Sequence, residues 1–237
     1  HGGLGRQRPH APVQLSLFGP DLSAVDEPGE WEWIAPALGD FAASVSGIIP
    51  QGFDRYLRIH HGAEESRDGW AMPPEVVESV AAIGARHTTS PDRAWFAVWE
   101  GYGWLGAQMM ASAPARRRDL LSRFRREKPF DDVFAEFEQR KAELAVEVES
   151  LPRLVTPGRN YLVLAGPVGA AATMRDPISL WALRPPDLWW PADRAWFVGS
   201  DTDLEWTYVA GESGFADEVL AAWPERVTVV DPRGPVE

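Results

Sequence analysis

The residues best suited to chemistry in this sequence fall in three places, and each also has a plainer structural interpretation. His60 and His61 are adjacent, and a pair of histidines can bind a metal ion or exchange protons near neutral pH. However, no metal-binding motif such as HExxH surrounds them, and His60 continues an apolar pattern. The sequence therefore favours a packed, hydrogen-bonded histidine at position 60 over a metal ligand.

Three acidic residues, Asp201, Asp203 and Glu205, form the second place. Residues two apart on an extended chain share one face, so the three carboxylates could face a divalent cation together. Asp side chains also accept backbone hydrogen bonds in tight turns, and no loop of EF-hand length follows. We therefore expect a turn here, and neither a metal site nor a cofactor.

The third place is the pentapeptide DRAWF, which occurs at residues 92–96 and again at 193–197. In a functional interpretation, the Asp and Arg of both copies would form paired acids and bases at a pseudo-symmetric cleft. In a structural interpretation, Asp and Arg anchor the start of a strand, while Trp and Phe fill its two faces. We favour the structural one, because it accounts for every residue. Two copies indicate either a duplicated half-domain or one motif used at two positions of a sheet.

The composition is that of an acidic, tryptophan-rich globular chain. It has 237 residues, a formal charge of −12, 12 Trp and no Cys. The lack of Cys excludes disulfides and thiol catalysis and fits a reducing cytoplasm. The acidic charge disfavours direct nucleic-acid binding and anionic membranes. No apolar run approaches the roughly 20 residues that span a bilayer, and no signal peptide is visible. We therefore expect a cytoplasmic protein.

Residues 1–30 are rich in Gly and Pro and lack a periodic apolar pattern, which predicts a disordered tail. Within the tail, residues 14–18 read QLSLF and are followed by Gly19 and Pro20. This pentapeptide resembles the motif by which bacterial polymerases and repair proteins dock onto the replicative sliding clamp. Gln can hydrogen-bond a polar rim, and Leu and Phe can fill apolar pockets. The partner-binding residues would then be Gln14, Leu15, Leu17 and Phe18. The alternative is an apolar patch that tacks the tail onto its own domain.

From residue 31 to 237 the patterns predict a single α+β domain. We expect a mixed, largely antiparallel sheet with helices packed on it. Strands are expected at 94–99, 161–165, 194–199, 204–210 and 226–230, with the third and fourth forming a hairpin. Helices are expected at 41–45, 53–60, 73–84, 178–183 and 213–223.

Residues 115–151 differ from the rest of the domain, because a basic cluster at 116–128 is followed by an acidic stretch at 131–151. We interpret this segment as a helical insertion, two helices forming a charged hairpin or lid between the repeated strands. The plainer alternative is a solvated helical insertion, since charge runs usually face solvent.

Residues 94–104, 189–197 and 203–209 together resemble a family of uncharacterised actinobacterial proteins. The resemblance would extend from residue 31 to the C-terminus, and it implies no activity. We therefore expect a non-enzymatic interaction protein, with the sliding clamp as its most concrete partner. One rival is an enzyme or small-molecule binder with a Trp-lined cleft that uses Asp201, Asp203, Arg194 or His60. Another is a protein that binds its partner through exposed tryptophans such as Trp189 and Trp190.

Overall fold

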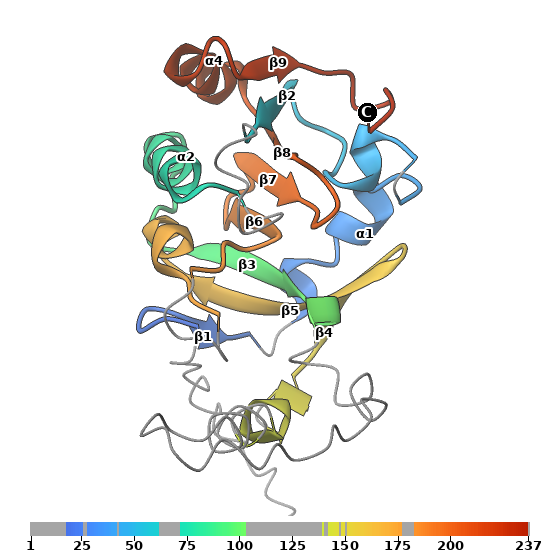
Figure 1. Cartoon of the computed structure of the whole chain (residues 1–237), viewed down its shortest axis with the longest axis vertical. Coiled ribbons are helices and arrows are strands. Elements are labelled where there is room, and N and C mark those ends of the chain that lie inside the picture. Colours follow the sequence, from blue (N-terminus) through green and yellow to red (C-terminus); the bar gives the residue numbers. More distant parts are fainter. Residues whose placement is uncertain are drawn as a thin grey trace, which may run out of the picture.

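The described part of the chain is built around one antiparallel sheet (Figure 1). The computed structural model describes residues 18–25, 28–41, 43–61, 72–102, 139, 142–146, 148–149, 151–176 and 183–236. Within these residues the sheet has nine strands in the order β1-β5-β3-β6-β7-β8-β2-β9, and β4 also pairs with β5. The strands are β1 (Ser23–Ala24), β2 (Arg55–His60), β3 (Ala94–Trp99), β4 (Arg153–Thr156), β5 (Arg159–Gly166), β6 (Leu188–Pro191), β7 (Trp196–Ser200), β8 (Trp206–Gly211) and β9 (Val227–Val229). The predicted α+β class with a largely antiparallel sheet is thus confirmed.

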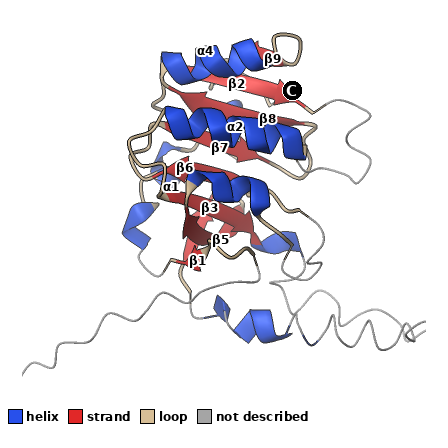
Figure 2. Cartoon of the chain, turned by 90° about the vertical axis from the view of Figure 1, so that its left-hand side faces the viewer, coloured by secondary structure: helices blue, strands red, loops and turns tan. Residues whose placement is uncertain are grey.

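The sheet separates two apolar layers, and Figure 2 shows α2 and α4 lying across one of its faces. The helices are α1 (Ile34–Ala37), α2 (Pro74–Arg86) and α4 (Ser213–Ala222), with 3-10 turns η1 (Pro28–Glu30), η2 (Val45–Gly47), η3 (Glu100–Tyr102) and η5 (Val168–Thr173). The helix-side core lies under α2, α4 and η5 and includes Val76, Val80, Phe96, Trp189, Trp196 and Phe215. The loop-side core lies on the opposite face and includes Ile34, Val45, Trp95, Trp190, Phe197 and Tyr208.

Strand β3 lies inside the sheet, as its two apolar faces predict. It pairs with β5 on one side and with β6 on the other. Phe96 and Val98 enter the helix-side core, whereas Trp95 and Ala97 enter the loop-side core. The predicted alternation of side chains between the two faces of this strand is therefore correct.

Strand β6 contains the adjacent tryptophans Trp189 and Trp190. Trp189 and Trp190 are fully buried, on opposite faces of the sheet. Trp189 stacks on Phe96 with ring centres 6.4 Å apart, and Trp190 stacks on Phe197 at 5.4 Å. Neither indole is available to a partner, and the prediction missed this strand because no polar residue marks its period.

The helix predicted at residues 53–60 is wrong, because this segment forms the six-residue strand β2. Its apolar residues fit a helical spacing, but Tyr56 and Leu57 lie in different cores, as neighbours on a strand do. β2 pairs with β8 along its whole length, and also with β9. Tertiary pairing thus overrides a short helical pattern.

The other predicted helices have mixed outcomes. α2 begins with Pro74 in its first turn, as predicted, and α4 covers the segment predicted after residue 213. The helix predicted at 41–45 is replaced by the 3-10 turn η2, in which Gly47 donates back to Ser44. Residues 177–182 lie outside the described residues.

The predicted boundary at residue 30 falls inside the folded part of the chain. Phe18 and Leu22 are buried in the helix-side core, and β1 pairs with β5 at the edge of the sheet. The carbonyl of Val163 accepts a further bond from the amide of Val25 at 3.4 Å. Residues 18–25 therefore belong to the domain, although their composition resembles that of the tail.

Most of the predicted insertion at 115–151 lies outside the described residues. Residues 139, 142–146 and 148–149 are helical, and Leu144 and Val148 are buried in the helix-side core. This helical piece thus has an apolar side against the domain, and it is not solvated all round. No helix among the described residues is long and apolar enough to cross a membrane.

Candidate functional site

Of the residues predicted to bind a partner, Phe18 is described and Gln14, Leu15 and Leu17 lie outside the described residues. Phe18 has no exposed surface, and its carbonyl oxygen accepts a hydrogen bond from the Arg175 amide at 2.8 Å. In this conformation Phe18 attaches the N-terminal segment to its own domain, which is the alternative that the sequence left open.

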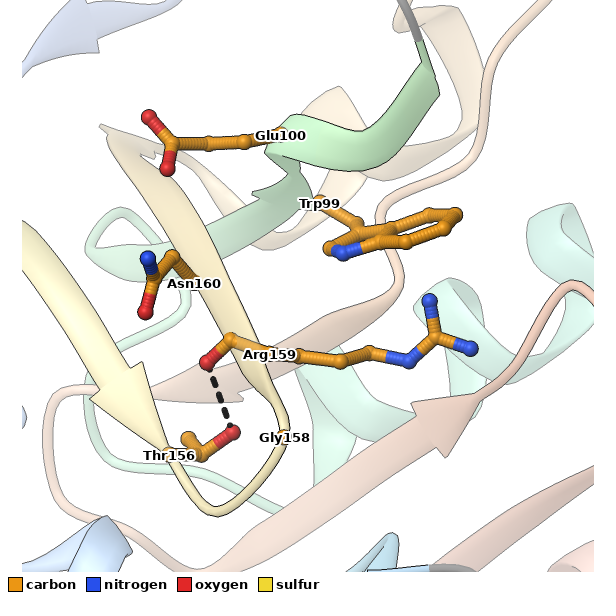
Figure 3. Close-up of a pocket in the computed structure, with 6 residues that line it drawn as sticks. All are labelled: Trp99, Glu100, Thr156, Gly158, Arg159 and Asn160. Carbon is orange, nitrogen blue, oxygen red and sulfur yellow. Dashed lines mark hydrogen bonds between the residues drawn. The ribbon is translucent and has the colours of Figure 1, made fainter. Parts of the chain in front are cut away.

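A hollow with a volume of about 390 Å³ lies where η3 meets the β4–β5 hairpin (Figure 3). Its lining residues are Trp99, Glu100, Thr156, Gly158, Arg159 and Asn160. In Figure 3 the Trp99 indole and the Arg159 side chain extend the same way, whereas Glu100 and Asn160 extend in the opposite direction. The lining therefore combines one indole ring with polar and charged side chains.

Arg159 is the most constrained charge in this hollow. Its side chain is only 7% exposed, and the guanidinium carbon lies 3.9 Å from the centre of the Trp99 ring and 5.0 Å from that of Phe41. Its Nη2 donates to the Asp201 carboxylate at 2.7 Å and lies 3.7 Å from the exposed Asp203. A buried ion pair is costly unless geometry and further bonds compensate. Stacking between two rings provides part of that compensation.

The backbone around Arg159 is shaped to admit these rings. Gly158 follows Pro157 in the turn between β4 and β5 and has a φ of 88°, which glycine adopts without strain. A Cβ on Gly158 would lie 3.0 Å from the Phe41 ring. Any larger residue would therefore displace Phe41 from its position beside Arg159.

Tyr161, on β5, is buried, and the charges of Asp187, Arg159 and Asp201 act on its hydroxyl group. Burial, followed by the negative charge of Asp187, raises the pKa of Tyr161 far above its ordinary value. Tyr161 therefore stays neutral across the physiological range. Asp187 is itself buried and accepts a hydrogen bond from the Trp99 amide at 2.8 Å. Asp187 thereby ties the end of β3 to the start of β6.

The acidic residues predicted to form a turn do so. Asp201 accepts a hydrogen bond from the Asp203 amide at 3.0 Å, while its carboxylate also holds Arg159. Glu205 is exposed, and its carbonyl accepts a bond from the His61 amide at 3.0 Å. Within the described ranges, no group of three or more His, Cys, Asp or Glu residues could hold a metal ion.

The two histidines have separate environments. His60 is half-buried at the end of β2, where burial and the nearby Arg58 lower its pKa. Its ring meets the edge of Trp206 at 6.0 Å. His61 is buried, and its Nε2 lies 2.8 Å from the Thr207 hydroxyl oxygen. His60 is thus packed as expected, although it sits on a strand, whereas the side-chain hydrogen bond is made by His61.

The two DRAWF copies begin close together, but β6 lies between their strands β3 and β7, and their acids and bases do not form a common cleft. The Ala192 amide donates to the Arg93 carbonyl at 3.0 Å, which joins one copy to the residue before the other. Arg93 covers Trp95, with its guanidinium carbon 4.9 Å from the ring centre, and Arg194 covers Trp33 at 5.0 Å. The structural interpretation is therefore the one that the contacts support.

The sequence prediction missed Arg159, which lines the hollow and contacts both Trp99 and Asp201. Its partners come from far along the chain, so spacing could not reveal them. One signal was available: Arg159 stands two places before the apolar run Tyr161–Ala165, and a cation entering a buried strand needs an anion. Of the rival's residues, Asp201 and Asp203 meet Arg159, whereas Arg194 stacks on Trp33 and His60 packs on Trp206.

Comparison of the chain with protein-family models, with curated proteins and with solved structures found no match.

Proposed function

We propose that this protein is a non-enzymatic interaction protein that docks onto the replicative sliding clamp through residues 14–18. The observation that carries the proposal is the pentapeptide QLSLF, which combines a polar residue with Leu and Phe anchors in the order the docking motif uses. A short extended segment of this kind costs little entropy to order on a partner.

The contacts within the domain are consistent with a carrier for this peptide. The candidate catalytic groups are engaged in structural roles: Asp201 holds Arg159, Asp193 closes a turn, and His61 bonds Thr207. The formal charge of the chain, −12, disfavours direct binding to the DNA backbone. The peptide would then act as a tether that keeps the domain near DNA.

The test is binding of the full chain to a purified bacterial sliding clamp. Leu17→Ala removes an anchor side chain and is expected to weaken binding at least about tenfold, as loss of an interface hot spot does. Ser16→Ala lies between the anchors and serves as the matched control, with little change expected. Binding that is absent, or that survives Leu17→Ala unchanged, would end the proposal.

A second candidate, a small-molecule-binding protein, is favoured by the hollow beside Trp99. Glu100 is the carboxylate that lines it, and Asp187, Asp201 and Asp203 contact the lining residues Trp99 and Arg159 from outside. Against these four carboxylates stand two guanidinium groups, those of Arg159 and of Arg153, which pairs with Glu100. The excess of negative charge suits a small organic cation better than an anion.

Agmatine and spermidine are suitable probes for this hollow, with acetate as the anionic control. Binding is read from chemical shifts of the Trp99 indole, and Asn160→Ala, at the exposed rim, is expected to reduce it. If neither cation shifts the Trp99 signal more than acetate does, this candidate is excluded.

A further inference from the structure

The residue that ends the docking peptide is also part of the domain's core. Phe18 has no exposed surface and belongs to the helix-side core. The hydrogen bond between its carbonyl oxygen and the Arg175 amide, 2.8 Å long, fixes the backbone at the same point. Four residues later Leu22 is buried as well, with 2% of its surface exposed.

One side chain cannot fill two apolar sites at once. We propose that the seat of Phe18 in the helix-side core competes with clamp docking, so that the fold withholds the peptide until Phe18 is released. This inference rests on the proposed function. Burial of a phenylalanine side chain favours the seated over the released conformation by about tenfold to a hundredfold. The apparent affinity of the chain for the clamp falls by the same factor.

The geometry of residues 19–22 allows release without dismantling the sheet. Between Phe18 and Leu22 stand Gly19, Pro20 and Asp21, and a turn in which the Leu22 amide donates to the Gly19 carbonyl at 3.3 Å. Opening this turn would let three residues extend to roughly 10 Å, at about 3.3–3.6 Å each. β1 could then stay paired with β5 while Phe18 leaves.

Leu22 provides a way to loosen the seat without changing the peptide. Its Cδ1 lies 3.5 Å from where a Cβ on Gly19 would stand, so its side chain packs against the turn that follows Phe18. Leu22→Ala should therefore favour release. Val219→Ala is the matched control, because Val219 is equally buried in the helix-side core but comes from α4.

The experiment measures how tightly three proteins, each spanning residues 1–237, and one peptide bind a purified bacterial sliding clamp. These are the unaltered chain, Leu22→Ala, Val219→Ala and a synthetic peptide of residues 10–20. We expect the peptide to bind at least about tenfold more tightly than the unaltered chain. Leu22→Ala should move toward the peptide, and Val219→Ala should not. Equal affinities for peptide and unaltered chain overturn the competition but leave the proposed function intact, whereas a peptide that does not bind ends both.

Amide hydrogen exchange of the unaltered chain is a second test of the competition, and it does not require any variant to fold. On saturation with the clamp, the Arg175 amide should exchange faster, because its acceptor on Phe18 has moved. The Leu162 amide, within β5, should keep its protection. A clamp-bound chain in which Arg175 remains as protected as before would show that Phe18 stays in place, and the competition would be refuted.

Discussion

Residues 92–96 and 193–197 have the same sequence and lead into the two strands that flank β6, but their Trp and Phe side chains face opposite sides of the sheet. In the first copy Trp95 belongs to the loop-side core and Phe96 to the helix-side core. In the second copy the assignment is reversed, with Trp196 in the helix-side core and Phe197 in the loop-side core. Five identical residues therefore do not specify which face is buried against which layer.

The turn before each strand accounts for the difference. The first copy runs directly into β3, which starts at Ala94. In the second copy Arg194 has a φ of 59°, its amide donates to the Pro191 carbonyl at 2.9 Å, and β7 starts only at Trp196. The hairpin register, with Trp189 opposite Val198, then decides the face of every residue in β7. The repeat is thus one local motif used at two positions, and not a duplicated half-domain.

The largest expected difference is between the two tryptophans. Trp196 is fully enclosed: its Nε1 donates to the Gly84 carbonyl at 2.9 Å and its ring stacks on Phe215. Trp95 lies under the side chain of Arg93, which is 61% exposed and can shift over a vacancy. Trp196→Ala should lower the free energy of unfolding by about 3–5 kcal/mol, and Trp95→Ala by at least about 1 kcal/mol less. Denaturant unfolding measures both, and equal losses would mean that the two faces are energetically equivalent.

Gly84 tests the packing of the second copy from the helix side. A Cβ at this position would lie 2.6 Å from the Trp196 ring, so α2 can approach only because the residue is glycine. Gly84→Ala should destabilise the protein by about 1–3 kcal/mol, although alanine is the better helix former. Gly169→Ala is the control, because a Cβ there meets nothing within 4 Å. A stabilised Gly84→Ala protein would contradict the close contact.

The two aspartates differ in what they hold. Both aspartates are exposed, but Asp193 accepts hydrogen bonds from the Thr88 hydroxyl, from the amide and hydroxyl of Thr89 and from the Ala195 amide. Among the described residues, no such bonds reach the Asp92 carboxylate. Asp193→Ala should cost about 1–2 kcal/mol, and Asp92→Ala less than about 0.5 kcal/mol. Thermal unfolding of both variants provides the comparison, which fails if the two losses match.

The same aspartate predicts a pH dependence. Burial disfavours its charged form, but the hydrogen bonds from Thr89, Thr88 and Ala195 outweigh this and lower the pKa of Asp193 below its ordinary value of 3.8. A lowered folded-state pKa stabilises the protein above the unfolded value, and this contribution is lost as the pH falls through the folded value. Between about pH 6 and pH 3, the Tm of the unaltered protein should therefore fall further than that of Asp193→Asn. Parallel Tm curves would refute this.

The smallest expected effect concerns the arginines. Arg194 has a positive φ that favours glycine, so Arg194→Gly relieves strain while losing the stack on Trp33. The two effects nearly cancel, and stability should change by less than about 0.5 kcal/mol. Arg93→Gly relieves no strain and should cost about 1 kcal/mol. Thermal unfolding measures both variants. If Arg194→Gly lost more stability than Arg93→Gly, the stack on Trp33 would contribute more than the relief of backbone strain at Arg194.

Local patterns alone were enough to predict several elements. The alternation of β3, the proline at the start of α2 and the turn at residues 201–203 follow from period, dihedral preference and side-chain hydrogen bonding. These are properties of neighbouring residues, so no distant contact was needed to read them. The α+β class followed from the same patterns.

Tertiary structure alone decided the rest. β2 is a strand because β8 and β9 supply its hydrogen bonds on both sides, although its apolar residues also fit a helix. Arg159 meets Asp201 because the sheet brings two distant turns together, and Phe18 joins the core because β5 leaves an edge for the N-terminal segment. In each case the deciding partner lies far away in sequence. Composition can show that a side chain needs a partner, but only the register of the sheet determines which partner it meets.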